Sequence, residues 1–367
     1  IETNVPGIEI AEPFPLQAKL ADKFSLVRSL HHDLDSHSDS GIIVMTGKRV
    51  RQPDPSSRSK SEHPDFGSIA SSVRGMSRHA IPPYVAVPRQ LYMTRPAYLG
   101  LHHGAFEIGD PSTKDYSPQQ LRIVGERDNS KLNNRRTLLT QLDRFRSGLD
   151  LSGSLDGMEK FRNLAYRMLT SPKTAEGFDI AKEDDKLRDR YGRNPWGQGC
   201  LLARRLAEAG TSVITVYMDR LEAASNSNWD DHPGADGRPG HFAQFMRPRM
   251  PTLDQCLSAL IEDIFDRGLD KRVMVVAVGE FGRTPRLSQN GNDTGRDHWP
   301  QAYTALVSGG GLKMGQVVGA TNSKAEYPTE RPYTPQDLLA TIYRHLGIDI
   351  HMTFNSFSGR PITVLNS

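Results

Sequence analysis

The stretch that decides the fold is VMVVAVGEFGRTP, residues 273–285. Its first six residues are apolar and mostly β-branched, which predicts a buried strand over 273–278. Glu280 lies just past the end of this strand, and Arg283 lies in the same loop. In open α/β sheets, ligands bind where loops leave the carboxyl ends of the strands. The stretch therefore predicts an α/β sheet with a polar site at its carboxyl edge.

Two helix–strand units lead up to this stretch, and the strand of the second unit is part of it. Apolar residues spaced three and four apart predict helices over 198–209 and 253–264. Each helix precedes an apolar run, over 211–218 in the first case and 273–278 in the second. Helices that alternate with strands at this spacing indicate a parallel sheet with helical crossovers.

The two ends of the chain add further elements. We expect a strand over 24–30 and another over 303–307. Thr334 and Pro335 suit the N-cap and the first position of a last helix, which ends at Gly347. The middle of the chain is different in character.

Residues 51–130 are rich in Pro, Ser, Arg and Gly and show weak periodicity. We expect them to form a long, mostly irregular excursion that covers the sheet edge or the site. Residues 131–170 return to a helical pattern, with leucines spaced three and four apart.

The composition is that of an ordinary globular protein. Of 367 residues, 37% are hydrophobic and 24% are charged, which is enough to bury a core. The net charge of +3 is too small to indicate a nucleic-acid or membrane partner. No apolar run approaches the ~18 residues of a membrane span. Cys200 and Cys256 lie in apolar, helix-like settings, which predicts two buried thiols rather than a disulfide.

Asp230 and His232 are two residues apart, so both side chains can reach one ion from a loop or from one face of a strand. A carboxylate with an imidazole suits Zn, Mn or Fe better than Ca. Asp231 between them is either a bystander or a partner of a ligand. The alternative is that Asp230 caps a turn and His232 is merely exposed, since one short motif often matches by chance.

Glu280 needs a partner, because a carboxylate at the end of a buried strand is costly unless it is paired or bound to a cation. Arg283 either forms that ion pair or binds a phosphate or sulfate, whose oxygens match its planar guanidinium. Asp297 and His298 form another candidate ligand pair, and Arg296 beside them is a further candidate for anion binding. The alternative for this pair is a capping aspartate next to a surface histidine.

Residues 31–38 contain three histidines, two aspartates and two serines, in a chain with 12 histidines in total. Ser36, His37 and Ser38 are each candidates for a nucleophile that a metal or a base activates. A helix that ends near Gly47 would then offer its N-terminus to an anion. The alternative is a solvated turn whose serines and aspartates bond their own backbone.

These motifs reveal a family resemblance. The chain resembles the domain-of-unknown-function family 1501, a sulfatase-like branch of the alkaline phosphatase superfamily. The matching segments are residues 21–32, 171–192 and 202–206, with WDDH at 229–232, GEFGRTP at 279–285 and GRDHW at 295–299. The resemblance covers nearly the whole chain and implies one alkaline phosphatase-like domain over 1–367. That fold is three-layer α/β/α with a mostly parallel central sheet.

The resemblance also implies roles for single residues. Asp230 and His232 take the place of one ligand pair, Glu280 that of an aspartate ligand, and His298 that of the last histidine ligand. His37 occupies the nucleophile position, where sulfatases carry a modified Cys or Ser. The family usually begins with a strand and a Gly-Gly-Pro-Ser segment that supply the first metal-binding aspartate. This sequence starts after them, so we expect the N-terminal strand to be missing and the metal site to lack one wall.

The leading hypothesis is a metal-dependent hydrolase of sulfate or phosphate esters. A divalent metal, Zn or Mn in preference to Ca, would be held by Asp230, His232, Glu280, Asp297 and His298. Arg283 and Arg296 would stabilise the oxyanion, and His37 would be nucleophile, general acid/base or ligand. The rival hypothesis is a non-catalytic protein that retains the sulfatase-like fold and binds a carbohydrate or a cell-surface ligand.

The leading hypothesis implies a small anionic ester as substrate, either free or carried on a carbohydrate. Members of the family are often exported with a cleaved signal. The resemblance therefore implies a periplasmic or extracytoplasmic location.

Overall fold

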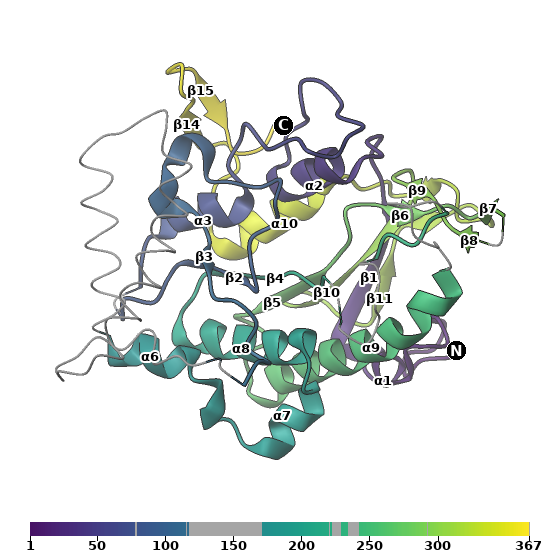
Figure 1. Cartoon of the computed structure of the whole chain (residues 1–367), viewed down its shortest axis with the longest axis horizontal. Coiled ribbons are helices and arrows are strands. Elements are labelled where there is room, and N and C mark those ends of the chain that lie inside the picture. The colour runs from purple at the N-terminus through teal and green to yellow at the C-terminus, as the bar shows by residue number, and fades with distance from the viewer. Residues whose placement is uncertain are drawn as a thin grey trace.

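The computed structural model describes residues 1–77, 79–114, 116, 171–219, 221, 229–233, 242–291 and 293–366. Within these residues the chain has a mixed α/β fold, in which the main strands lie between two groups of helices (Figure 1). The helix predicted over 131–170 lies outside the described residues.

The larger sheet has four strands. In spatial order they are β11 (Gln316–Val318), β1 (Phe24–Leu30), β10 (Tyr303–Gly309) and β5 (Met274–Ala277). β1 is parallel to β11 and antiparallel to β10, and β10 is antiparallel to β5. β1 and β5 therefore run in the same direction. The strands predicted over 24–30, 273–278 and 303–307 are confirmed.

This sheet is mixed rather than mostly parallel as expected, because β10 runs against both of its neighbours. The reason lies in the connection from β5 to β10. Its described residues form short antiparallel pairs instead of a crossover helix: β6 (Gly282–Arg283) with β9 (His298–Trp299), and β7 (Ser288–Asn290) with β8 (Asp293–Gly295). Parallel strands need a long crossover, so the chain enters the sheet again antiparallel.

The second sheet has three parallel strands. Their order is β3 (Phe106–Glu107), β2 (Tyr84–Val87) and β4 (Val213–Val216). All four residues of β2 are at most 1% exposed. The segment 51–130, predicted to be mostly irregular, thus supplies a central buried strand. Its proline and serine neighbours mask the short apolar run YVAV, which is only four residues long.

The helices form two groups on opposite sides of the strands (Figure 1). One group contains α1 (Pro15–Ala18), α6 (Pro172–Phe178), α7 (Asp185–Tyr191), α8 (Pro195–Ala209) and α9 (Phe242–Asp266). The other contains α2 (His37–Thr46), α3 (Phe66–Arg74) and α10 (Pro335–Leu346). The helices predicted over 198–209 and 253–264 are confirmed within α8 and α9. In the described ranges, no helix combines the length and apolar character that crossing a membrane requires.

Local sequence signals set the ends of α2 and α10. The Ser36 hydroxyl accepts a hydrogen bond from the Asp39 amide and begins α2. Thr334 forms a capping box with Asp337 at the start of α10. Gly347 ends this helix in the left-handed region at φ 69°, where glycine has no steric penalty. The predicted last helix is therefore confirmed at both ends.

Shorter elements complete the described chain. The 3₁₀ turns are Ala21–Lys23, Ala97–Leu99, Leu101–His103 and Ile180–Lys182. Two small antiparallel pairs lie near the carboxyl terminus: β12 (Ala320–Thr321) with β13 (Pro328–Glu330), and β14 (Thr353–Asn355) with β15 (Pro361–Thr363).

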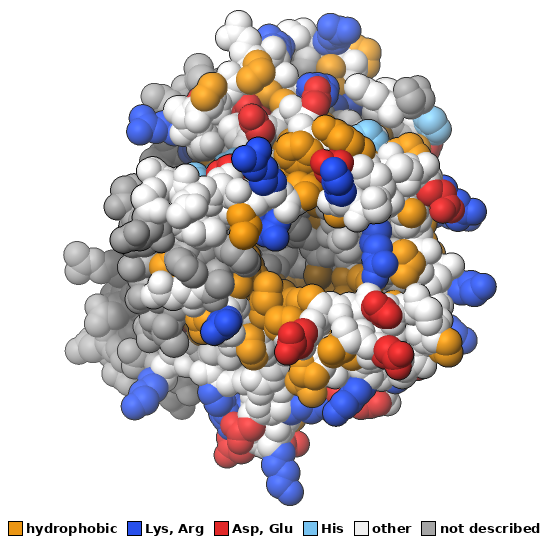
Figure 2. All heavy atoms as spheres, turned by 90° about the vertical axis from the view of Figure 1, so that its right-hand side faces the viewer, with side chains coloured by type: hydrophobic (Ala, Val, Ile, Leu, Met, Phe, Trp, Pro, Cys, Tyr) orange, Lys and Arg blue, Asp and Glu red, His pale blue; other side chains and the backbone are white. Residues whose placement is uncertain are grey.

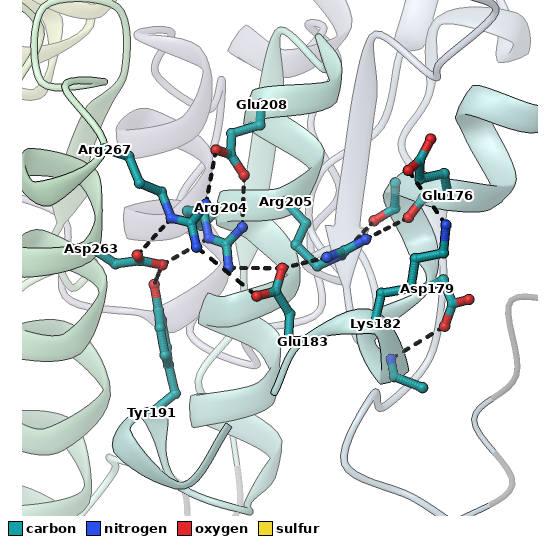
Figure 3. A network of polar contacts seen from close by, with 12 residues as sticks. Glu176, Asp179, Lys182, Glu183, Tyr191, Arg204, Arg205, Glu208, Asp263 and Arg267 are labelled. Carbon is teal, nitrogen blue, oxygen red and sulfur yellow. Dashed lines mark hydrogen bonds and ion pairs between the residues drawn. The ribbon is translucent and has the colours of Figure 1, made fainter. Parts of the chain in front are cut away.

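A buried ionic network joins α8 to α9 (Figure 3). Arg204 on α8 is 2% exposed and lies 2.8 Å from Asp263 on α9 and 3.0 Å from Glu183. The Tyr191 hydroxyl donates to the same Asp263 carboxylate over 2.9 Å. Buried charges are tolerated when each has a partner, as here. Cys200 and Cys256 lie in the apolar core between the same helices as buried free thiols, which confirms that prediction.

Candidate metal centre

The site forms beyond the carboxyl ends of β1, β4 and β5. β1 leads through residues 31–36 to His37, the first residue of α2. β5 leads to Glu280, and His298 lies on β9. The Trp229 indole donates to the carbonyl of Met218 just beyond β4, which brings Asp230 to the same place. Residues distant in sequence thus meet at one edge, as expected for strands whose carboxyl ends point together.

Three of these side chains form a candidate metal site. The Nε2 atoms of His37 and His298 lie 3.0 and 2.9 Å from the two carboxylate oxygens of Asp230. The candidate ligand atoms all lie within 4.8 Å of one another. The three side chains are 20–25% exposed, so they are shielded but accessible. Imidazole nitrogen with carboxylate oxygen is a donor set that suits transition metals.

The other ring nitrogens of the two histidines are held by acceptors. His37 Nδ1 lies 2.7 Å from Oε1 of Glu280, and His298 Nδ1 lies 2.5 Å from the carbonyl oxygen of Asp35. A carbonyl or an ionised carboxylate only accepts, so both Nδ1 atoms donate. Metal-ligating histidines characteristically donate their second ring nitrogen to such groups. The surroundings of both rings therefore fit a ligand role.

The electrostatics of the site favour a positive charge between these groups. Burial alone lowers the pKa of His37, but hydrogen bonds to Asp230 and Glu280 outweigh it and raise the pKa to about 9. Burial alone raises the pKa of Asp230, but hydrogen bonds from its three histidine neighbours hold the pKa well below its usual range. Burial opposes ionisation of Glu280 too, yet the hydrogen bond from His37 lowers its pKa. The two carboxylates thus favour positive charge beside them, either as a proton on His37 or as a bound cation.

His232 and Arg283 also contact Asp230. His232 Nε2 lies 3.4 Å from Oδ2 of Asp230, and the pKa of His232 is raised by this carboxylate. The Arg283 guanidinium donates to Oδ1 of Asp230 over 3.0 Å and to the Trp229 carbonyl over 2.7 Å. Arg283 is therefore the ion-pair partner of Asp230, whereas the Glu280 carboxylate bonds His37.

Arg296 and Asp297 lie differently. Arg296 donates from one guanidinium nitrogen to the carbonyls of Thr284 and Pro285, over 2.5 and 2.7 Å. Asp297 accepts a hydrogen bond from the Ser288 hydroxyl on β7. The structure brings His37, Asp230, His232, Glu280, Arg283 and His298 together, while these two residues brace the adjoining β6–β9 loop.

The two serines beside His37 are already engaged. The Ser36 hydroxyl caps α2. Ser38 is fully buried and donates to the carboxylate of Asp39 over 3.3 Å. Of the three candidates for a nucleophile in this loop, His37 is the one whose side chain reaches the site.

Several supporting residues were not predicted. His32 donates from Nε2 to the Glu280 carbonyl over 2.6 Å and accepts at Nδ1 from the Leu34 amide, and burial lowers its pKa. Arg249 on α9 is fully buried and donates to Asp231 over 2.8 Å, next to Asp230. Of the two roles left open for Asp231, this contact favours a partner over a bystander. The dense loop 31–38 was a signal for His32, but a lone arginine on a helix offered none.

A comparison with known protein families covers almost the whole chain. The family model described as "Protein of unknown function (DUF1501)" matches residues 1–366. The chain belongs to the DUF1501 family. No curated protein and no solved structure matches this chain. Every side chain of the DUF1501 site described above lies within the matched residues.

Proposed function

We propose that this DUF1501 protein is a metal-dependent hydrolase of sulfate or phosphate esters, with an alkaline phosphatase-like arrangement of its site. The orientation of His37 and His298 carries the proposal. Each ring donates its Nδ1 proton outward and turns Nε2 toward one oxygen of Asp230. An Nε2 lone pair that faces a carboxylate is repelled unless a proton or a metal ion lies between them, and the raised pKa of His37 means that a proton fills this position until a metal displaces it. A divalent cation satisfies all three groups at once.

In this proposal His37, Asp230 and His298 hold the ion. His232 lies beside them, with its Nε2 3.4 Å from Oδ2 of Asp230. Two imidazoles with one carboxylate suit Zn or Mn better than Ca, which prefers oxygen ligands. Glu280 acts through His37, because its carboxylate fixes the tautomer and orientation of that ring.

The site has room for a substrate. His37, Asp230, His298 and Arg283 all line a cavity of about 2130 Å³. A divalent ion held there would supply Lewis-acid polarisation of a sulfuryl or phosphoryl oxygen. Arg283 adds positive charge beside the ion, which favours an anionic ester. Because the serines beside His37 are engaged and His37 is a ligand, we infer that water is the attacking group.

The first test is metal content. We expect the purified protein to bind about one Zn²⁺ or Mn²⁺ per chain, measured by inductively coupled plasma mass spectrometry after dialysis. His37→Ala and His298→Ala, checked for folding by circular dichroism, should lose most of this metal. His63→Ala is the matched control, because His63 contacts Tyr98 instead of the site. No bound metal in the parent protein, or equal metal in all variants, would contradict the proposal.

The second test is turnover by the metal-loaded protein. A panel of aryl sulfates, phosphomonoesters and phosphodiesters should contain at least one class that is hydrolysed, with activity lost in His298→Ala and kept in His63→Ala. If metal binds stoichiometrically but no ester is hydrolysed, the hydrolase proposal is wrong and the rival hypothesis of a binding protein stands.

A further inference from the structure

The amino terminus of α2 is bonded by a residue from a separate loop. The backbone amide of His37, the first residue of α2, donates to the hydroxyl oxygen of Ser57 over 3.1 Å. The amide of Asp39 donates to the Ser36 hydroxyl. The first amide of α2 is therefore already occupied, and the polar group beside the backbone of His37 is the Ser57 hydroxyl.

Ser57 has an unusual backbone conformation. Its φ is 53°, in the left-handed region that residues other than glycine rarely adopt. Its amide donates to the Asp54 carbonyl over 3.1 Å and closes a turn. Glycine would occupy this position without steric cost. Residues that are held in such a conformation cluster at binding and catalytic sites. A serine here indicates that its hydroxyl has a use that a glycine would lose.

The loop that carries Ser57 is held in place by the carboxylate of Asp54. This carboxylate accepts hydrogen bonds of 2.5–3.0 Å from four groups of the loop: the amide and the hydroxyl of Ser56, the amide of Arg58 and the hydroxyl of Ser59. The Asp54 amide donates to the carboxylate of Asp39, a buried residue of α2, over 2.7 Å. The loop is thus fixed to the same helix that begins at His37.

Tyr92 holds Ser57 from another direction. Its hydroxyl donates to the Ser57 carbonyl over 2.8 Å. Burial raises the pKa of Tyr92 to about 12, and the negative charge of Glu280 adds to this shift, so the two groups lie within electrostatic range of each other. Ser57 and Tyr92 line the same cavity as His37 and Asp230. These contacts place Ser57 in the wall of the cavity, next to the metal centre.

The hydroxyl of Ser57 has a proton to donate. A serine hydroxyl offers one proton and two lone pairs. One lone pair accepts from the His37 amide, and in the part of the chain that the structure describes the proton has no acceptor. The amides at the start of a helix carry partial positive charge, which polarises the oxygen that they bond and makes its proton a better donor. A preorganised donor is therefore available at the wall of the cavity.

We propose that Ser57 is a substrate-binding residue whose hydroxyl donates a hydrogen bond to a non-bridging oxygen of a tetrahedral anion beside the metal centre. The inference rests on the proposed function for the nature of this anion, which is the sulfuryl or phosphoryl group of an ester. Arg283 contributes positive charge from the side of Asp230. Figure 2 shows a hollow in one face of the molecule with Lys and Arg side chains at its rim, and such charges favour the approach of an anion.

The test measures anion binding directly, so it does not depend on turnover. Inorganic phosphate and inorganic sulfate are titrated separately into protein equilibrated with one equivalent of Zn²⁺, and isothermal titration calorimetry gives each Kd. Ser57→Gly removes the hydroxyl and suits the positive φ, so the turn keeps its conformation. We expect this variant to bind the anion about tenfold more weakly than the parent protein, because a hydrogen bond to a charged group is lost.

Ser59→Ala is the matched control. It removes a hydroxyl of the same loop that bonds Asp54, and it should keep the affinity of the parent protein for the anion. The zinc content of Ser57→Gly should also match that of the parent protein, whereas a residue that only supports His37 would lose zinc when it is replaced.

The proposal is overturned if the parent protein binds neither anion, or if Ser57→Gly binds the anion as tightly as the parent does. Equal weakening in Ser59→Ala, or loss of zinc together with the anion in Ser57→Gly, also overturns it. Weaker anion binding in Ser57→Gly alone, without hydrolysis of any ester by the parent, refutes the proposed hydrolase and leaves this role of Ser57 standing. Ester hydrolysis with the same KM in Ser57→Gly and the parent refutes the role of Ser57 alone.

Discussion

At the scale of single residues, the charge balance of the site rests on Asp230. Its two oxygens meet His37, His298 and Arg283 within 3.0 Å, so one carboxylate faces several cationic or metal-binding groups. Burial makes each of these contacts stronger than it would be in water, and makes the loss of a partner more costly. A second buried carboxylate, Asp65, lies apart from the site. Its pKa is raised, whereas the pKa of Asp230 is lowered.

Asp65 is the N-cap of α3 and is completely buried, with hydrogen bonds from the Ser68 amide and the Gln90 side chain. Burial raises its pKa to about 6, although the bonds from Ser68 and Gln90 oppose the shift. A raised folded-state pKa gives stability that is present below the unfolded-state pKa near 4 and is lost as pH rises through 6. Asp65→Asn keeps the cap and removes the titration.

We therefore expect the free energy of unfolding of the parent protein to fall between pH 4 and pH 7 relative to that of Asp65→Asn. The relative loss should be on the order of 3 kcal/mol, since each pKa unit corresponds to about 1.4 kcal/mol. Urea titrations at several pH values measure it. A constant difference between the two proteins across this range would contradict the assignment.

At the scale of elements, the caps of α10 show how local sequence fixes a boundary. Thr334→Ala removes the hydroxyl that accepts from the Asp337 amide, and we expect a loss of about 1 kcal/mol in the free energy of unfolding. Thr341→Ala on the same helix is the control, because its hydroxyl only donates to the Asp337 carbonyl one turn earlier. Urea unfolding of both variants measures these free energies. Equal losses in the two variants would rule out a specific cap effect.

The helices and strands also show which parts of the fold can be predicted from the sequence and which cannot. Apolar patterns located β1, β5, α8 and α9, because burial within an element leaves a pattern in its own residues. The capping residues Thr334 and Gly347 located α10. It could not predict that β10 would run antiparallel or that β4 and β5 would remain apart, because partner and direction depend on distant segments. At the site, the sequence predicted the side chains that lie in dense motifs. It did not predict that the Asp35 carbonyl holds His298, because every residue has a backbone carbonyl and no sequence pattern marks this one.

At the scale of the whole molecule, a metal in the proposed centre ties together segments from distant parts of the chain. A ligand that binds only the folded state stabilises it by about 2.7 kcal/mol when its free concentration is 100 times Kd. We therefore expect a chelator to lower the thermal midpoint by on the order of 5 °C. Differential scanning fluorimetry with and without EDTA measures this shift. His298→Ala should show no EDTA effect, and an equal effect in that variant would place the metal elsewhere.

The pairing of β1 with β10 has a consequence for the synthesis of the protein. Phe24 lies opposite Ser308, so β1 cannot pair with β10 until the long stretch of chain between them has been made. Until then the backbone groups of β1 face solvent, and contacts so distant in sequence form slowly because closing the loop costs entropy. His37 likewise meets His298 only after the residues between them have been made. Folding therefore depends on keeping β1 from wrong pairings until β10 has been made.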